Sequence, residues 1–481
     1  MIPVVSPNEA TVALLAPPHT SFLPSPDARR WRVVAIFGFA NLLQGLLWAL
    51  PGPLAQAHSD AYGVSGADVQ LMVNLGSIIF LLGALPAAAA LDAGLLHRCT
   101  LVSIALLTAA TALRVSCDIY APQPRFLLLG AAVLNGAAGL ILMGGVAALV
   151  ETWCPVGERG LATGFLIASN NSGLDVSFLL AATGATPAST DDAPLAIVRT
   201  RLFLLNATVF MAALLLLMIA SVALPRAPRV PPSASAAAAA RTEASFSPAV
   251  FIATALTLAD TPGVLVAIAA NGAVLGVLSS WQAVLSMVVA PLGIGAAAAG
   301  WLGFASSLLG NAAGVLAGAA VDLSAAKNVL SNHHRTAVVF AFALAGASFA
   351  SFAAIATGIG NSLTTPALAA LYATSIVGVV ALCAAAPIVI ELVVGAAFPA
   401  PEGSTLMLLC FAANATPVPL LFLPAGVGTG GGGVLSWALS ATCAAAAAAI
   451  ATVCLPPKRA VFDAEGLLTY QVLIPEDVTV L

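Results

Sequence analysis

The chain has 481 residues, of which 60% are hydrophobic and only 7% are charged, and its formal net charge is −4. A soluble protein of this length cannot bury so much apolar surface in ordinary domains, whereas a lipid bilayer accommodates it. The weakly negative charge offers no basic surface to nucleic acid. We therefore expect an integral membrane protein. Its partners should include the lipid bilayer and should not include nucleic acid.

The first 28 residues contain six prolines and no cationic start, which is typical of a disordered tail and not of a signal peptide. From residue 29 onward the sequence predicts twelve apolar runs long enough to cross a bilayer as helices. A proline-, alanine- and serine-rich linker at 225–258 separates the sixth run from the seventh. The predicted runs are 31–56, 68–91, 99–120, 126–150, 159–184, 200–224, 262–289, 297–320, 336–357, 365–391, 404–424 and 434–455.

This count predicts an all-α membrane protein of two six-helix bundles, at 29–224 and 259–455, followed by a tail at 456–481. An even number of spans places both tails on one side of the membrane. Twelve of the sixteen Lys and Arg residues then fall on that side, close to the helix ends. The positive-inside rule therefore predicts that both tails and the linker are cytoplasmic.

Two loops share a pattern of glutamate and proline although they lie far apart in the chain. VETWCPVGERG (150–160) joins the fourth and fifth spans, and IELVVGAAFPAPEGS (390–404) joins the tenth and eleventh. In each, a glutamate ends the incoming helix, Pro-x-x-Glu opens the outgoing helix, and an asparagine follows twelve residues later. The matched pairs are Glu151 and Glu391, Pro155 and Pro399, Glu158 and Glu402, and Asn170 and Asn414.

Two further pairs repeat in the same order along the chain. AALD ends at Asp92 and AAVD at Asp322, and Asn41 with Trp48 in the first span matches Asn271 with Trp281 in the seventh. Together with the matching loops, these pairs make three repeated patterns in the same order along the chain, which indicates duplicated six-helix halves.

The charged residues of these loops have two interpretations. They are helix caps in aqueous loops, where a carboxylate favours a helix N-terminus, or they form a gate that pairs across the halves. The gate hypothesis predicts that Asp92 contacts the start of the eleventh span. It also predicts that Asp322 contacts the start of the fifth span, near Arg159. The gating candidates are Asp92, Glu158, Arg159, Asp322, Glu391 and Glu402.

Several stretches spread over the chain carry a resemblance to a known family. They are RRWRVVAIF (29–37), LLQGLLWALPGPL (42–54), AYGVSG (61–66), AGWLGF (299–304) and PIVIELVVGAAFPAPEG (387–403). With them the chain resembles the major facilitator superfamily, and within it the feline leukaemia virus subgroup C receptor-related transporters, nearest to the disrupted-in-renal-carcinoma-2 branch. The resemblance implies the major facilitator fold and alternating-access transport of a small organic solute. Haem, choline, ethanolamine and pyridoxine are handled by different members.

One position separates the branches of that family. In the choline-handling members a tryptophan directly follows the glutamine of the first span, whereas here Gly45 follows Gln44 and the tryptophan comes later, at Trp48. This difference disfavours a choline-type aromatic cage and favours a vitamin-like or other small metabolite. A non-transporting receptor or scaffold with the same fold is the alternative.

Polar side chains within membrane spans usually face the protein interior or a wet cavity. In the resembling architecture, spans 1, 4, 7 and 10 line the substrate cavity, with spans 5 and 11 beside them. Interhelical hydrogen bonding is the other interpretation of any single asparagine. The substrate-binding candidates are Asn41, Gln44, Trp48, Asn135, Asn171, Asp175, Asn271, Trp281, Gln282, Tyr372 and Asn414.

Asp175 is also the candidate site for a coupling proton or a substrate cation, because an intramembrane carboxylate must be protonated, paired or hydrated. An ion pair with Arg114 is the structural alternative.

No catalytic, metal or cofactor site is expected, since no nucleophile–base pair stands in a suitable place and the seven cysteines are dispersed. Tyr470-Gln-Val-Leu fits a sorting signal and favours an endolysosomal membrane, with the plasma membrane as the alternative. We expect a monomer.

Overall fold

The computed structural model describes residues 27–120, 123–184, 194–241, 261–326, 332–358, 364–422 and 433–463, together with residues 252, 256 and 258. The predicted tail at 1–28, except for its last two residues, and the Tyr470 motif lie outside these ranges. Within them, twelve helical segments are long and apolar enough to cross a membrane, as the hydropathy predicts. The spanning helices are α2 (Arg30–Ala49), α4 (Gly66–Asp92), α5 (Leu96–Tyr120), α6 (Pro124–Gly144), α8 (Arg159–Ala182), α9 (Leu195–Ala223), α12 (Pro262–Ala283), α14 (Ala296–Ala326), α15 (Asn332–Gly358), α16 (Thr365–Ala397), α17 (Glu402–Ala415) and α20 (Gly433–Thr452).

Short helices connect some of these spans. They are α3 (Ala55–Tyr62), α7 (Val146–Trp153), η2 (Val156–Glu158), α10 (Ala234–Arg241), α13 (Leu285–Val289), η3 (Ala290–Leu292) and α18 (Pro417–Phe422). Four predicted spans end early or are interrupted, and the eleventh span is interrupted at Thr416, between α17 and α18. The first ends at Ala49 because Pro51 and Pro53 interrupt it, and the chain turns into α3. The fourth breaks at Gly145, and the seventh ends at Ala283 before α13.

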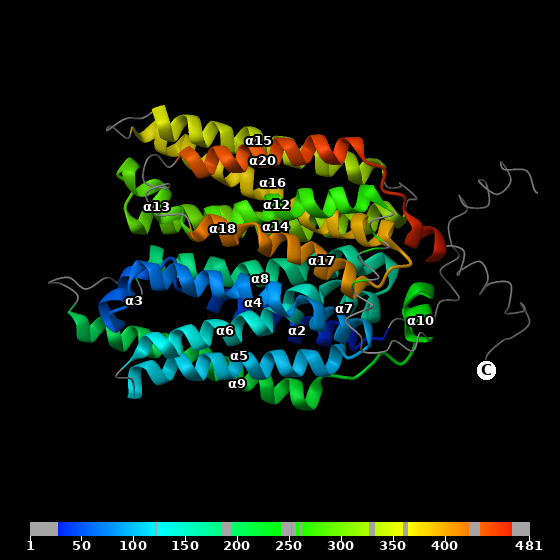
Figure 1. Cartoon of the computed structure of the whole chain (residues 1–481), viewed down its shortest axis with the longest axis horizontal. Coiled ribbons are helices and arrows are strands. Elements are labelled where there is room, and N and C mark those ends of the chain that lie inside the picture. The colour runs from blue at the N-terminus through cyan, green and yellow to red at the C-terminus, as the bar shows by residue number, and fades with distance from the viewer. Residues whose placement is uncertain are drawn as a thin grey trace, which may run out of the picture.

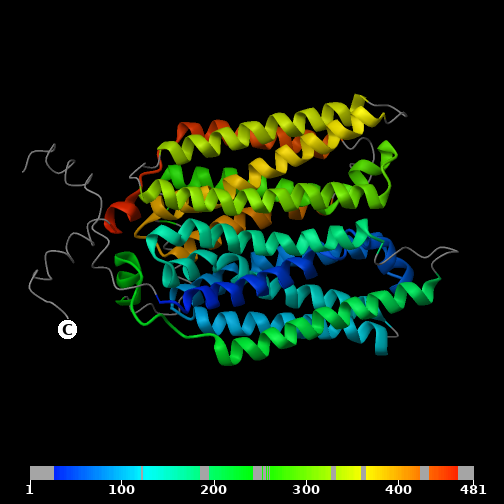
Figure 2. The ribbon, with the colours of Figure 1, turned by 180° about the vertical axis from the view of Figure 1, so that it is seen from behind.

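The helices form two bundles that lie side by side. Figure 1 shows α2 to α9 in one bundle, in blue to green, and α12 to α20 in the other, in green to red; Figure 2 shows the same division from behind. The two bundles meet along α8 with α14 and along α4 with α17.

Glycines allow α8 and α14 to approach closely. A Cβ atom added at Gly160 would lie 2.4 Å from the carbonyl oxygen of Gly318, and one added at Gly164 would lie 2.8 Å from that of Gly314. A Cβ at Gly300 would likewise meet Ala182 near the other end of the pair. Small residues at this spacing are the usual way in which membrane helices bring their backbones together. The two halves are therefore in contact along the length of α8.

Candidate functional site

One end of the molecule, which we call the charged end, carries the helix termini with Asp92, Glu151, Glu158, Arg159, Asp322, Glu391 and Glu402. It lies on the right of Figure 1, beside α7 and α10. Glu158 ends η2 immediately before α8, and Glu402 is the first residue of α17. Both glutamates thus stand at helix starts, as the sequence predicts.

Two aspartates cross from one half to the other at this end. Asp322, on α14, accepts hydrogen bonds from the backbone N–H groups of Gly160 at 2.8 Å and Leu161 at 2.7 Å, in the first turn of α8. Asp92, on α4, accepts from the N–H of Ser404 at 3.1 Å and from its hydroxyl, in the first turn of α17. Each carboxylate therefore caps a helix N-terminus of the opposite half. The contacts that the gate hypothesis predicts are present, and the gating role itself stays a prediction.

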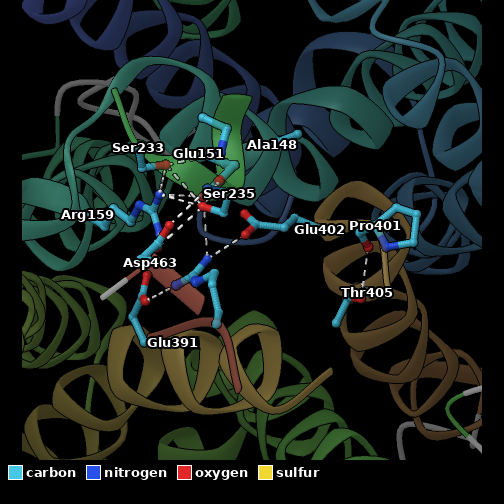
Figure 3. Close-up of polar contacts among 12 residues, drawn as sticks. Ala148, Glu151, Arg159, Ser233, Ser235, Glu391, Pro401, Glu402, Thr405 and Asp463 are labelled. Carbon is cyan, nitrogen blue, oxygen red and sulfur yellow. Dashed lines mark hydrogen bonds and ion pairs between the residues drawn. The ribbon is translucent and has the colours of Figure 1, made fainter. Parts of the chain in front are cut away.

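A buried network of charges lies beside these caps (Figure 3). Arg159, the first residue of α8, pairs with Glu151 at 2.8 Å and with Asp463 at 3.1 Å. Its guanidinium also donates to the hydroxyls of Ser233 at 2.7 Å and Ser235 at 3.1 Å, beside and within the linker helix α10. The linker and the chain beyond α20 are thus bonded to the first half.

Arg459, which follows α20, pairs with three glutamates of this network. Its guanidinium bonds Glu391, lies 2.6 Å from Glu402 and lies 3.7 Å from Glu151. Burial lowers the pKa of Arg459, but these carboxylates raise it well above its ordinary value. Burial raises the pKa of Glu151, and Arg159 followed by Arg459 reverses that effect, so its pKa lies below its ordinary value. Such groups are tolerated away from water only because they are paired.

Glu158 stands apart from the network. It pairs instead with Arg30 at the start of α2, through two hydrogen bonds of 2.6 and 2.8 Å. Two parallel bonds between a guanidinium and a carboxylate fix the geometry of both groups. Glu158 therefore ties α2 to the start of α8 within the first half.

Part of the candidate substrate set forms an amide cluster between α2, α6 and α8. Asn170 donates to the side-chain oxygen of Gln44 at 2.7 Å and to the carbonyl oxygen of Asn41 at 3.1 Å. Asn135 donates to the carbonyl oxygen of Gln44 at 3.3 Å, and its own Oδ1 meets no partner among the described residues. Trp48, one helical turn from Gln44, donates to the carbonyl oxygen of Val73 at 3.2 Å and lines a cavity of about 10 Å³ with Asn135. This cavity has room for about one water molecule.

Asp175 lies at the interface of the two halves. Asn311, on α14, donates to its Oδ2 at 2.7 Å, and both side chains are buried. Asp175 Oδ1 and Asn311 Oδ1 have no hydrogen-bond partner among the described residues. Asn171 and Asn311 line a second cavity of about 10 Å³, again with room for about one water molecule. Two amides from opposite halves thus meet at this small cavity, and one of them, Asn311, is bonded to the Asp175 carboxylate.

Arg114 has other contacts, at the end of the molecule opposite the charged end. Its guanidinium lies 3.0 Å from His58 Nε2 on α3 and donates to Asn206 at 3.1 Å. His58 Nδ1 donates to the carbonyl oxygen of Leu54 at 2.9 Å, so Nε2 is the acceptor. Burial, reinforced by the charge of Arg114, lowers the pKa of His58 to about 3. This arrangement replaces the Arg114–Asp175 ion pair that was the alternative from sequence.

The remaining candidates lie apart from the amide cluster. Trp281 packs against Phe349 and Phe352 with ring centroids 5.3 and 5.5 Å apart and donates to Ser436 at 2.9 Å, in the core of the second half. Tyr372 donates to the carbonyl oxygen of Ala298 at 2.6 Å. Asn414 donates within its own helix, Asn271 is buried on α12, and Gln282 is half-buried beside Trp281. The structure therefore does not join the first-half and second-half candidates into one set.

Sequence reasoning missed several residues that the structure places at these sites. They are Asn170, Ser235, Asn311, Arg459 and Asp463. A signal existed for Asn170, which marks the repeat and directly precedes the candidate Asn171, but none for the others. Among the described residues, no group of three or more His, Cys, Asp or Glu side chains is arranged to hold a metal ion.

Comparison with known proteins decides the family. The family model described as Major Facilitator Superfamily matches residues 37–400. The protein belongs to the major facilitator superfamily. It is a multi-pass membrane protein and a secondary transporter, not an enzyme.

Named relatives agree with the resemblance seen in the sequence. The transporter is 28% identical over 409 residues to the solute carrier family 49 member 4 homolog of Xenopus tropicalis, covering 83% of this chain and 86% of the relative. It is 28% identical over 399 residues to the Xenopus laevis homolog, covering 81% and 84%. Solute carrier family 49 member 4 is the disrupted-in-renal-carcinoma-2 branch, so that resemblance is confirmed.

Solved structures share the fold at low identity. A D-xylose–proton symporter matches with a TM-score of 0.60 and 15% identity, covering 89% of this chain and 99% of that chain. The fucose:proton symporter of E. coli matches with a TM-score of 0.60 and 12% identity, covering 86% and 97%. At such identities the likeness concerns the fold alone, and it confirms the predicted twelve-helix architecture.

Proposed function

We propose that this transporter moves a small, polar organic solute of vitamin-like size by alternating access of its two halves. The charged end faces the cytoplasm in this proposal, because twelve of the sixteen Lys and Arg residues fall on the side of the tails and linker. Transport is coupled to a proton at Asp175. An endolysosomal membrane is the proposed location, with the plasma membrane as the alternative.

The amide cluster is the observation that carries the choice of substrate class. Asn41, Gln44, Asn135 and Asn170 gather on helices of the first half, and α8 also packs against α14 of the second. Amides donate and accept at once, so they suit hydroxyls or a neutral polar ring better than a permanent cation. Within the cluster no aromatic cage surrounds Gln44, since Gly45 follows it and Trp48 bonds to α4. A pyridoxine-like solute fits this chemistry better than choline does.

Asp175 supports the proposed coupling because it is buried against the opposite half. Its unpartnered oxygen has no cation beside it among the described residues. An ionised carboxylate in that position is unfavourable unless a proton or cation joins it. Separation of α8 from α14 would remove Asn311 and expose the carboxylate, so protonation and the conformation of the halves are linked.

The test begins with purified protein and a thermal-shift screen against pyridoxine and related vitamins, choline and other amines, and haem. A solute that stabilises the protein is then followed by flux into proteoliposomes with and without a pH gradient. Flux that follows the gradient is expected. Binding without flux would instead support the receptor interpretation and refute transport.

The coupling residue is tested in the same liposomes. Asp175→Asn should bind the solute and keep its expression level but lose the dependence of flux on the pH gradient, whereas Asp175→Glu should retain it. Unchanged pH dependence in a well-folded Asp175→Asn variant would refute the coupling role.

A further inference from the structure

The two repeats differ in how they neutralise their glutamates. In the first half, Glu151 pairs with Arg159 from its own loop at 2.8 Å. The repeat places Gly403 at the position that matches Arg159, immediately after Glu402. The second loop, from Glu391 to Gly403, contains no Lys or Arg. Its two glutamates therefore need a cation from elsewhere in the chain.

The structure gives a steric reason for glycine at position 403. A Cβ atom there would lie 2.8 Å from Asp92 Oδ1 and 2.9 Å from the Cβ of Leu91. Asp92 holds that place because it caps the adjacent Ser404. No arginine can therefore stand at 403 while α4 and α17 are together at the charged end, even though the same position in the first half carries one.

Arg459 occupies the place of the missing cation. It bonds both Glu391 and Glu402 of the second half and approaches Glu151 of the first, and only 6% of its surface is exposed. It comes from the segment 456–463, which follows the last spanning helix. Lys458, the preceding residue, is exposed and forms none of these ion pairs within the described residues.

The same segment also holds the first half and the linker. Asp463, 3% exposed, pairs with Arg159 at 3.1 Å and accepts a hydrogen bond from the backbone N–H of Ser235 at 2.9 Å. Phe462 packs against Phe398 of the second loop, with ring centroids 4.9 Å apart. Arg459 and Asp463 lie four residues apart, on one face of a helical turn. Arg459 thus pairs with glutamates of the second half, and Asp463 pairs with Arg159 of the first.

We propose that residues 456–463 are a removable clamp on the charged end, with Arg459 and Asp463 as its positioning residues. Because the clamp bonds both halves, the charged end opens only when this segment leaves. The proposal rests on the proposed alternating access, and it adds that opening of this end is controlled by a part of the chain outside both bundles. Arg459 gives the glutamates of the second half the positive charge that Arg159 gives Glu151 in the first half.

Cys154 provides a reporter that needs no substrate. It is fully buried between α7 and α8 at the charged end, and burial raises the pKa of its thiol to about 12. Its reaction with a water-soluble maleimide therefore measures opening of this end. The full-length protein is used with Cys454→Ser, since Cys454 is exposed, and labelling is read for the Cys154 peptide by mass spectrometry.

Arg459→Gln should raise the labelling rate of Cys154 at least about tenfold, because it leaves Glu391 and Glu402 without their cation. Asp463→Asn should also raise the rate, because it removes the ion pair between this segment and Arg159. Arg459→Lys should restore part of the protection. Lys458→Gln, one residue away, is the matched control and should label at the original rate. Labelling of Arg459→Gln at the original rate, in protein that elutes as a single folded species, would overturn the proposal.

A second variant decides the matter if Arg459→Gln does not fold. Phe398→Cys with Phe462→Cys, joined by a short reducible bis-methanethiosulfonate reagent, holds the clamp in place without altering its charges. The joined protein should label at Cys154 more slowly than the same protein after reduction, and equal rates would overturn the clamp. These readouts need neither solute nor proton coupling, so an absence of flux with a normal labelling response would count only against the proposed function.

Discussion

Asp322→Asn offers the sharpest test of the gate. Asp322 accepts two backbone N–H groups, from Gly160 and Leu161, with one carboxylate oxygen each. Asparagine keeps a single oxygen, and its NH₂ group would face the other N–H donor. A hydrogen bond to a charged group is worth about 1.5–3 kcal/mol, so the closed charged end should lose about 2–3 kcal/mol. That is roughly a 30- to 150-fold change in the ratio of closed to open protein.

Asp92→Asn should have a smaller effect, although the repeat makes the two positions equivalent. Asp92 accepts from the backbone N–H and the hydroxyl of Ser404. An asparagine oxygen can keep the N–H, and the hydroxyl can turn to accept from the NH₂ group. The backbone N–H of Leu161 has no such freedom. The order of effect, with Asp322→Asn larger, therefore follows from the chemistry of the capped groups.

The assay measures distances between spin labels at Arg98→Cys and His333→Cys, two exposed positions in the first turns of α5 and α15, one in each half. If 1% of the original protein is open, the Asp322→Asn variant should be roughly a quarter to 60% open. Asp60→Asn is the control, since Asp60 lies at the opposite end of the molecule, where it accepts a hydrogen bond from Gln56. The gate would be refuted if the open population of Asp322→Asn, read from its distance distribution, lay within about a factor of three of that of the original protein. A solute affinity that collapses while turnover stays normal would refute it equally.

Two further predictions concern stability. His58 has a pKa of about 3 in the folded protein, against an ordinary value of 6.5. Between pH 6.5 and pH 3 the unfolded chain therefore binds more protons than the folded protein does. The free energy of unfolding should fall by up to about 1.4 kcal/mol per pH unit as the pH drops through that window. Thermal unfolding in detergent checks this, and His58→Gln should flatten the slope. Gly318→Ala would bring a Cβ within 2.1 Å of the Gly160 carbonyl oxygen and should cost about 1–3 kcal/mol, seen as a lower Tm, while Gly157→Ala, which meets nothing within 4 Å, should not.

The cross-half caps could be predicted from the sequence because the repeat supplies their geometry. Asp92 and Asp322 end equivalent helices, and the Pro-x-x-Glu motifs begin equivalent ones, so a two-fold arrangement brings each aspartate to the opposite helix start. Hydropathy alone located the twelve spans, because each apolar run is long enough to cross a bilayer as a helix. It set several boundaries wrongly; two examples are the first and fourth spans, where Pro51 and Gly145 interrupt the helices without lowering the hydropathy of the run.

The clamp could not be predicted, and the reason is physical. Arg459 lies outside the repeated halves, so no internal match assigns it a partner, and its spacing from Glu391 carries no periodic signal. The environment of Trp281 could not be predicted from the sequence either. An apolar helix such as α12 gives no polar stripe that tells the core side from the interface side, so only tertiary packing places that ring against Phe349 and Phe352.

A single helix, α8, links the charged end to the proposed coupling site. Its first turn is held by Asp322 and Arg159, its middle by Asn170 to Gln44, and its later part by Asp175 to Asn311. The fifteen steps from Gly160 to Asp175 span about 22 Å of helix. The close contact of this stretch with α14 leaves little room for independent movement of its two ends. A displacement of α8 from α14 that breaks the Asp322 cap must therefore also strain the Asp175–Asn311 bond. Protonation of Asp175 weakens that same bond from the other side, because the amide then donates to a neutral group. In the proposed mechanism α8 is therefore the one rigid element that couples the two sites, so that a proton bound at Asp175 would bias the opening of the distant gate.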